Sequence, residues 1–506
     1  MESVPHPSSP AALPAPAAPR TLGLSWPLLV VLATFFGLLV QLPVNKILGD
    51  GDTYWHIAAG RWIAEHGTVP HSDPFSHSMP GAPWTAHEWL AEVVMQAVHG
   101  AAGWAGLVTL TATALALTLA LLTRFLMRRM EPVHALLLVA LAAAMSLSHV
   151  LARPHVLAWP LLMLWVATLV NAGEARRGPP WWLLGVMLLW ANLHGSFTIG
   201  LALGAALALD AVLAQPQGQR RQLALRWAAF VALSALAALL TPFGVEAVEF
   251  TLHVMSLKVA LAAIGEWQSP NFHLLQPFLV WLLLMLGLGL SGCVRLPWVR
   301  LLLLVGLVYL ALKHQRNIAL LGMVSPLLLA VPLARGLKAA TSGASDAAAL
   351  DRWFRALAQP SRWGARVAGL CVVALLVAGV LPAREPRPEA SITPQRAVEA
   401  ALAAGAQGPV FNDYGFGGYL IYRGIPVHID GRADMYGDRF LQDTIDAMQL
   451  KDRRGFLAFL ERHGFGWSLL LPGTPAVALL DELPGWRRVY ADDDAVVHVC
   501  AGARRP

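Results

Sequence analysis

The stretch LSWPLLVVLATFFGLLVQLPVNKILGDGDTYWH, residues 24–56, decides the fold. It opens with an apolar run of about 20 residues, which is the length that an α-helix needs to cross a bilayer. The acidic segment GDGDTYWH follows directly at 49–56. The run has no charged region close before it and no small-residue cleavage site, which indicates an uncleaved first span rather than a signal peptide. We therefore expect a membrane protein that holds carboxylates beside the bilayer.

The rest of the chain repeats the apolar pattern. Hydrophobic residues make up 56% of its 506 positions and charged residues 13%, against about 25% charged in soluble proteins. Further apolar runs predict a polytopic α-helical membrane protein with about eleven transmembrane helices. The expected spans are 24–43, 104–126, 132–149, 156–172, 180–193, 196–214, 225–241, 275–292, 298–313, 317–334 and 364–382. The pair at 180–214 is also compatible with one broken helix.

Arginines predict how the chain is oriented. With the N-terminal tail inside, the inner loops collect most of the basic residues, as the positive-inside rule requires. Those inner residues are Arg124, Arg128, Arg129, Arg176, Arg177, Arg220, Arg221, Arg226, Arg295, Arg300, Arg335, Lys338, Arg352, Arg355 and Arg362. We expect an integral membrane protein with a disordered cytoplasmic tail at 1–23 and a transmembrane part at 24–384. The net charge of +6 lies in short loops and does not indicate nucleic-acid binding.

Two regions are expected outside the membrane on the outer face. The long loop 44–103 contains two stretches of helical periodicity, which predict two interfacial helices with tryptophans at headgroup depth. Residues 385–506 predict a small periplasmic α/β domain. Its expected strands are 409–413, 426–430, 466–471 and a hairpin at 486–499, and its expected helices are 394–405, 438–463 and 475–482. The three cysteines are too scattered for a disulfide framework or a zinc site.

The first candidate group follows the first span. Asp52 beside the membrane is suited to take a proton from an acceptor hydroxyl or to hold a metal ion, with Asp50 next to it and His56 one turn later. The structural alternative is that Asp52 only caps the helix that begins at Thr53. In TAHEW at 85–89 a capping box formed with Thr85 is the favoured explanation of Glu88, and His87 is left open.

More candidates lie in loops that the predicted orientation of the spans places on the same face of the membrane. Arg153 and His155 lie between two spans, where an arginine needs a partner: a phosphate, a lipid headgroup or a structural ion pair. Asn192 and His194 interrupt an apolar stretch, which favours either a cavity wall or a tight interhelical turn. Three further residues complete the set, namely Glu266, His314 and Arg316. Their common side of the membrane is the evidence that they act together.

The C-terminal region supplies three candidates. Asp413 and Asp430 stand at the ends of two expected strands, each closely followed by glycine, and Arg432 comes shortly after. Glycine there allows the backbone to approach another group closely. Ordinary turn chemistry explains the same residues equally well.

Several enzyme classes are disfavoured. The sequence has no P-loop, GxSxG, HExxH or CxxC motif and no dinucleotide fingerprint in a strand-helix context. ATP-driven transport and serine hydrolysis therefore become poor explanations. No spacing identifies a metal site, although a divalent cation is compatible with the acidic residues.

The layout resembles the GT-C superfamily of integral-membrane glycosyltransferases. The resemblance covers most of the chain as architecture, and as a residue motif it centres on 49–56. More closely, DTYWHIAAGRWI, HEWLAE, WANLHGSF, FNDYGFGGYL and IDGRADMYG are similar to a group of bacterial membrane proteins usually placed in that class.

The resemblance implies an inverting hexosyl- or pentosyltransferase that uses a polyprenyl-phosphate-linked sugar donor. The acidic residue after the first span, Asp52 here, then serves as base or orients the acceptor, which is a glycan, a lipid or a protein. Arg153, His155, His194, His314 and Arg316 would face the lipid phosphate. The alternatives are a non-catalytic envelope assembly partner and a transporter of lipid-linked glycans or small solutes.

Overall fold

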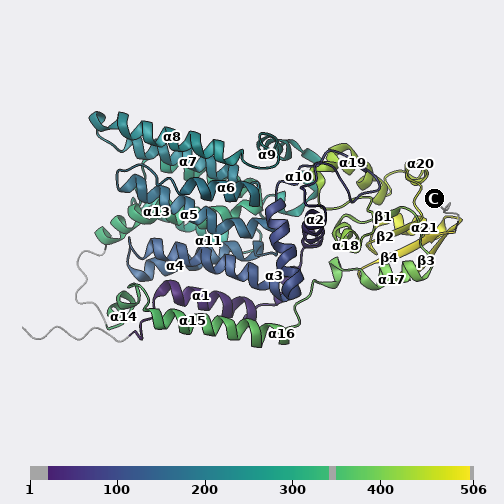
Figure 1. Ribbon diagram of the computed structural model, residues 1–506, viewed down its shortest axis with the longest axis horizontal. Helices are drawn as coiled ribbons and strands as arrows, with labels where there is room; N and C mark the ends of the chain where they lie inside the picture. The colour runs from purple at the N-terminus through teal and green to yellow at the C-terminus, as the bar shows by residue number, and fades with distance from the viewer. Residues whose placement is uncertain (1–20, 341–348, 502–506) are drawn as a thin grey trace, which may run out of the picture.

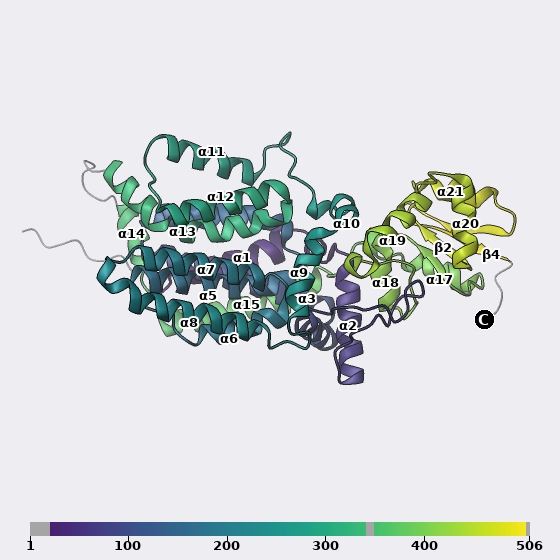
Figure 2. The ribbon, with the colours of Figure 1, turned by 90° about the horizontal axis from the view of Figure 1, so that it is seen from above.

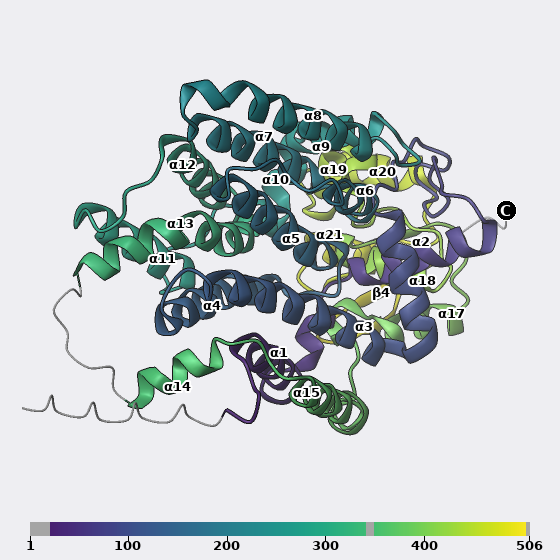
Figure 3. The ribbon, with the colours of Figure 1, turned by 60° about the vertical axis from the view of Figure 1, so that its left-hand side comes forward.

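The computed structural model describes residues 21–340 and 349–501. Most of the expected tail at 1–23 lies outside the described residues. A bundle of roughly parallel helices fills one end of the molecule, and the C-terminal elements with their small sheet lie at the other (Figure 1). Helices α2 (Asp52–His66), α9 (Glu246–Ser256) and α10 (Lys258–Ala263) lie where the two ends meet (Figures 1 and 2). With the α14 end of the bundle turned forward, the C-terminal elements lie behind the helices (Figure 3).

Every expected span contains a helix. The bundle helices are α1 (Trp26–Phe36), α3 (Trp89–Leu126), α4 (Pro132–Ser146), α5 (Pro154–Glu174), α6 (Leu183–Leu193), α7 (Phe197–Leu213), α8 (Arg220–Ala238), α11 (Pro277–Leu290), α12 (Trp298–Lys313), α13 (Ile318–Ala340) and α15 (Trp363–Leu375). Helix α11 lies at the edge of the bundle (Figure 2) and buries only Phe278 and Trp281.

Length and composition single out fewer crossings than the sequence suggested. Within 21–340 and 349–501, five helices are long and apolar enough to cross a bilayer, and four more are apolar but shorter. Helices α8 and α12 fall in neither group, since arginines lie within them at Arg220, Arg221, Arg226 and Arg300. The number of eleven crossings therefore stays a prediction.

Two breaks in the helices lie where the sequence places them. Gly103 has a φ of 57° and separates the outer part of α3 from its apolar part, because glycine adopts this backbone conformation without a Cβ clash. His194 is extended between α6 and α7, so the stretch 180–214 forms two helices. The expected interfacial helix near Leu90 is thus the start of α3.

The bundle has two polar ends. At one end Arg129 pairs with Glu174 at 2.7 Å, and Arg300 pairs with Asp210 at 2.8 Å. These residues come from loops and helix ends that the charge rule assigns to the inner side. An extra helix, α14 (Ala349–Leu357), joins this end through Arg355, which pairs with Glu131. The opposite end carries the candidate functional residues.

The first outer loop folds against the C-terminal region. Its helix α2 (Asp52–His66) packs on α18 (Gly417–Tyr422), and Val427 forms a bridge with Ser76 of the loop. The expected strand at 426–430 is therefore wrong, because this segment pairs with the loop at a single bridge and not with the sheet. The side chain of Trp55 in α2 is buried within the protein, beside Trp84.

The C-terminal sheet has the order β1-β2-β4-β3, with β1 and β2 parallel and the other pairs antiparallel. Its strands are β1 (Val410–Asn412), β2 (Trp467–Leu470), β3 (Trp486–Ala491) and β4 (Val496–Cys500). The nearby helices are α17 (Gln395–Ala403), α19 (Ala433–Met448), α20 (Arg453–His463) and α21 (Pro475–Glu482). The single helix expected at 438–463 is two helices, because Asp452 caps a new start with its carboxylate.

Candidate active site

The two carboxylates of the acidic segment after the first span, Asp50 and Asp52, make different contacts. Oδ1 of Asp50 accepts a hydrogen bond from the backbone N–H of Asp52 at 2.9 Å. Asp50 therefore stabilises the start of α2, and the N-cap position belongs to Gly51. The alternative that Asp52 is merely a cap is wrong. Its carboxylate is left for another partner.

That partner is Arg153, the residue before α5. Its Nη2 lies 2.9 Å from Oδ2 of Asp52, and its Nη1 lies 3.1 Å from Oδ2 of Asp50. The same Nη1 lies 3.4 Å from Glu266, which in turn pairs with Arg316 at 3.0 Å. We call these five residues the acid–arginine cluster. They come from four segments far apart in sequence, around residues 50–52, 153, 266 and 316, and their side chains are 18–28% exposed.

The charges in the cluster set its protonation. Burial raises the pKa of Asp52 to about 7, with Asp50 adding to the rise and Arg153 opposing it. Burial also raises the pKa of Glu266, but Arg153 and Arg316 outweigh it and hold that pKa at about 2. A carboxylate that titrates near neutral pH is suited to exchange a proton with a substrate. Asp52 has this property, and Glu266 stays ionised.

A second cluster lies beside the first and is built around Glu88. Its carboxylate lies 3.3 Å from Nε2 of His194, 3.6 Å from Nε2 of His87 and 3.8 Å from Nε2 of His56. We call these four residues the glutamate–histidine cluster. Nδ1 of His56 also lies 3.4 Å from Glu92, one turn further along α3. The rings of His194 and His155 are 6.2 Å apart, which brings this cluster next to the loop of Arg153.

The histidines of this cluster are neutral. Burial lowers the pKa of His87, and it lowers the pKa of His56 and His194 well below the usual range, with Arg153 adding to the effect on both. Burial raises the pKa of Glu88 to about 7, against the opposing charge of Arg153. The site therefore holds two acids, Asp52 and Glu88, that titrate near neutral pH. Such acids are frequent in catalytic sites.

The capping box expected at Glu88 is wrong. The side chain of Glu88 makes no capping hydrogen bond to α3. The hydroxyl of Thr85 instead donates to Glu246 at 2.7 Å, and Glu246 begins α9 (Glu246–Ser256). With its expected partner engaged elsewhere, Glu88 turns toward the histidines.

Glycines of the C-terminal region close over Asp52. A Cβ added to Gly431 would overlap Oδ1 of Asp52, and a Cβ added to Gly418 would overlap the carbonyl of Gly51. The hydroxyl of Tyr414 donates to the carbonyl of Gly431 at 3.1 Å. The motifs FNDYGFGGYL and IDGRADMYG thus supply backbone, not charged side chains, to the surroundings of Asp52.

The acidic and basic side chains of those motifs have other partners. Asp430 accepts from Nε and Nη2 of Arg432 at 2.8 and 2.7 Å, and Nη1 of Arg432 donates to Asp73 at 2.7 Å. Tyr436 completes this network with a hydrogen bond to Asp430. Asp413 accepts from the backbone N–H of Gly415 and shapes a turn. Among the described residues, Asp413, Asp430 and Arg432 make their hydrogen bonds and ion pairs outside the acid–arginine cluster.

The remaining candidates line the same end of the bundle in supporting positions. Nε2 of His155 interacts with the carbonyl of His149 at 2.9 Å, and Nδ1 of His314 interacts with the carbonyl of Trp267. Asn192 accepts from Nε1 of Trp89 and donates to the carbonyls of Leu188 and Leu240. These contacts hold loops and helix ends in place.

Glu92, Trp267 and Asp73 also belong to these networks and were not among the candidates. Glu92 follows Glu88 by one helical turn, so the spacing in HEWLAE contains a signal for it. Trp267 lies under the guanidinium of Arg316, 4.2 Å from its ring centroid. Asp73 pairs with Arg432, 359 positions away, and no local sequence pattern predicts a contact over that distance.

The clusters do not fit a divalent cation. Among residues 21–340 and 349–501, no three or more His, Cys, Asp and Glu side chains are arranged to hold a metal ion. In the acid–arginine cluster the guanidinium of Arg153 lies between the three carboxylates.

Solved structures share this fold. No protein-family model and no curated protein matches the chain. The archaeal oligosaccharyltransferase AglB from Archaeoglobus fulgidus, solved with an inhibitory peptide and a dolichol-phosphate, matches with a TM-score of 0.52 at 12% identity, over 95% of this chain and 74% of AglB. ArnT from Cupriavidus metallidurans bound to undecaprenyl phosphate matches with a TM-score of 0.51 at 15% identity, over 95% of this chain and 99% of ArnT. The GT-C fold expected from the motifs is confirmed.

Proposed function

We propose that the chain is a membrane glycosyltransferase that moves a sugar from a polyprenyl-phosphate donor to an acceptor on the outer face of the bacterial plasma membrane. The observation that carries the proposal is the environment of Asp52. It is a largely buried carboxylate with a pKa of about 7, held 2.9 Å from an arginine at one end of a helical bundle. The fold shared with two structures that hold polyprenyl or dolichol phosphate supports the same class of donor.

In this proposal Asp52 is the general base. The acceptor oxygen attacks the anomeric carbon in line with the bond to the donor phosphate, and that bond breaks with its electron pair leaving on the polyprenyl phosphate. The acceptor proton passes to Asp52. Attack opposite the leaving group inverts the anomeric carbon. One positioned base contributes about 10²–10⁴-fold, so positioning and charge must supply the rest.

Charge stabilisation falls to the arginines, within limits that the structure sets. Three carboxylates face two arginines in the acid–arginine cluster, so its basic groups are already paired. Arg316 has a single carboxylate partner within the cluster, and at 28% its side chain is more exposed than that of Arg153. We therefore assign the contact with the donor phosphate to Arg316, whose planar guanidinium suits phosphate oxygens.

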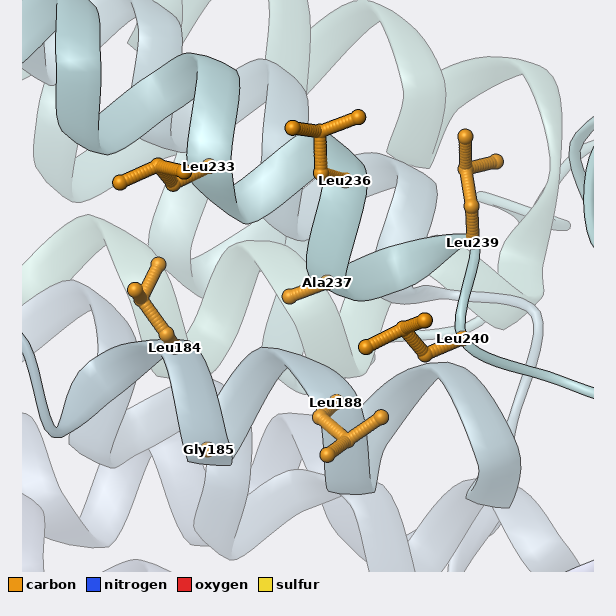
Figure 4. Close-up of a pocket in the computed structure, with 8 residues that line it drawn as sticks. All are labelled: Leu184, Gly185, Leu188, Leu233, Leu236, Ala237, Leu239 and Leu240. Carbon is orange, nitrogen blue, oxygen red and sulfur yellow. The ribbon is translucent and has the colours of Figure 1, made fainter.

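An apolar groove offers a place for the lipid tail. It lies between α6 and α8, has a volume of about 540 Å³ and is lined by Leu, Ala and Gly alone (Figure 4). Two of its lining residues, Leu188 and Leu240, accept hydrogen bonds from Asn192, which lies two residues before His194. We assign this groove to the polyprenyl chain of the donor.

The proposal includes the arrangement in the membrane. The tail is cytoplasmic, residues 24–384 form the membrane part, and the α/β region at 385–506 is periplasmic. Arginines at the end of the bundle opposite Asp52 support this orientation.

The test is a transfer assay with the full-length protein in proteoliposomes. Wild-type protein is given a panel of polyprenyl-phosphate sugars together with an extract of envelope glycans, lipids and proteins, and the formation of a new glycosidic bond is measured. We expect one donor to be consumed by wild type and not by Asp52→Asn. The control is Asp446→Asn, which alters an exposed ion pair with Lys451 and should be fully active.

Two results would support the alternatives instead. Movement of an intact lipid-linked glycan or a solute across the bilayer without any new bond would favour a transporter. An assembly partner would be favoured by two observations together: folded wild-type protein consumes no donor in the assay, and Asp52→Asn leaves the envelope phenotype of cells unchanged. Either result would overturn the proposed transfer.

A further inference from the structure

The three carboxylates of the acid–arginine cluster are used almost completely by hydrogen bonds and ion pairs. Oδ1 of Asp50 accepts from the backbone of Asp52, and Oδ2 of Asp50 faces Arg153. Oε1 of Glu266 faces Arg316, and Oε2 of Glu266 faces Arg153. Oδ2 of Asp52 also faces Arg153. Oδ1 of Asp52, which lies beside Gly431, makes no ion pair in the cluster.

A divalent cation would need the space that Arg153 occupies. Mg²⁺ and Ca²⁺ bind carboxylate oxygens at about 2.0–2.6 Å and require several of them at once. Here the oxygens of Asp50, Asp52 and Glu266 converge on one guanidinium at 2.9–3.4 Å. A guanidinium presents its donors in a fixed planar fork, which matches carboxylates from two sides.

The backbone holds Arg153 in this position. Its N–H donates to the carbonyl of Leu151 at 2.8 Å, and Pro154 follows as the first residue of α5. Its neighbour Ala152 donates to the carbonyl of Ile47, which ties this loop to the segment before Asp50. The charge is therefore built into the fold and does not depend on a bound ion.

We propose that Arg153 takes the place of a divalent cation in this site: it gathers the three carboxylates, and its fixed positive charge replaces that of a metal ion beside the reacting atoms. The part of this inference that concerns catalysis rests on the proposed function. The part that concerns ion binding does not. Oδ1 of Asp52 stays outside the ion pairs of the cluster, and transfer needs no divalent metal.

The first test measures Mn²⁺ binding by electron paramagnetic resonance on the purified full-length protein. We expect no stoichiometric site in wild type. Arg153→Ala leaves three carboxylates without their cation, so we expect it to gain one Mn²⁺ per chain, and Arg153→Ala combined with Asp50→Asn to lose it again. A stoichiometric Mn²⁺ in wild type that disappears in Asp50→Asn would overturn the proposal, whether or not the protein transfers sugar.

The second test uses the transfer assay. Wild-type activity should be unchanged by a chelator, and a loss that added Mg²⁺ or Mn²⁺ reverses would overturn the proposal. Removing one preorganised positive group should lower the activity of Arg153→Ala by about 10²–10³-fold, with partial recovery in guanidinium chloride at concentrations that leave wild type active. Arg129→Ala, at the other end of the bundle, is the matched control. If Arg153→Ala does not fold, the two wild-type measurements decide.

Discussion

Two arginines in this molecule, Arg432 and Arg153, bind carboxylates in opposite ways. Arg432 is 1% exposed, its three donor nitrogens are all bonded, and its partners Asp73 and Asp430 are fully buried. Arg153 is 19% exposed and holds three carboxylates, one of which also has a pKa of about 7. The first network uses each group completely. The second keeps an acid that can still change its protonation state.

The two networks therefore have different roles: that of Arg432 stabilises the structure, and that of Arg153 is suited to a chemical role. Although burial lowers it, Asp430 and Asp73 keep the pKa of Arg432 well above its ordinary value, so that network is permanently charged. It fixes the loop of Gly431, which closes over Asp52. The buried charges near Arg432 therefore position the backbone, and the partly open charges near Arg153 are available to a substrate.

The largest contrast should be seen on replacing one aspartate in each network. Asp52→Asn removes the proposed base and should lower the transfer rate by about 10²–10⁴-fold. Asp430→Asn keeps the shape of a residue that touches no proposed reacting group, so folded protein should retain most of its activity. Initial rates of the two purified variants, normalised to folded protein, test this. Equal losses would remove the distinction between the networks.

Stability should respond in the reverse order. Arg432→Met leaves Asp73 and Asp430 buried without their cation, which costs about 3–5 kcal/mol. Arg316→Met removes an arginine that is 28% exposed, and water can reach the carboxylate left behind, so its cost should be smaller. Denaturant unfolding in detergent measures both. A greater loss for Arg316→Met would contradict our assignment of structural and catalytic roles.

A smaller effect is expected at the glycine that touches Asp52. Gly431→Ala would push its Cβ into the carboxylate, and a displacement of the base should cost about tenfold in rate. Gly473→Ala is the matched control, since nothing lies within 4 Å of its added Cβ. If both variants react at the wild-type rate, the close approach of Gly431 has no catalytic meaning.

The smallest effect is a shift in pH dependence. The negative charge of Asp50 helps to raise the pKa of Asp52. Asp50→Asn keeps an oxygen to accept from the backbone of Asp52 but removes that charge, so the pKa of Asp52 should fall. The rising limb of the pH–rate profile should then move to lower pH. A shift to higher pH would have the wrong sign for our account.

Much of the fold followed from the sequence. Apolar runs located a helix at every expected span, and the segment after the first span pointed to Asp50 and Asp52. Assigning alternate loops to opposite faces placed Arg153, Glu266 and Arg316 on one side, and the structure brings them into contact. Each membrane crossing moves the next loop to the opposite face, so the order of apolar runs along the sequence is enough to predict the face on which each loop lies.

Other features depend on contacts that no local pattern encodes. The cap expected for Glu88 failed because Glu246, 161 residues from Thr85, takes the hydroxyl. The candidates Asp430 and Arg432 bind each other, and Asp73 of the outer loop binds Arg432, so neither faces the acid–arginine cluster. Of the partners expected for Arg153, the structure shows the ion pair, and it involves three carboxylates that only the folded chain brings together.

The pH dependence of transfer by the wild-type protein tests the role of Asp52 most directly. Because burial raises its pKa, Asp52 is protonated and unable to accept a proton below that value, and ionised above it. The account predicts a rate that rises with pH with a midpoint near 7. A rate that is already maximal at pH 5, as expected for an ordinary exposed aspartate, would contradict it.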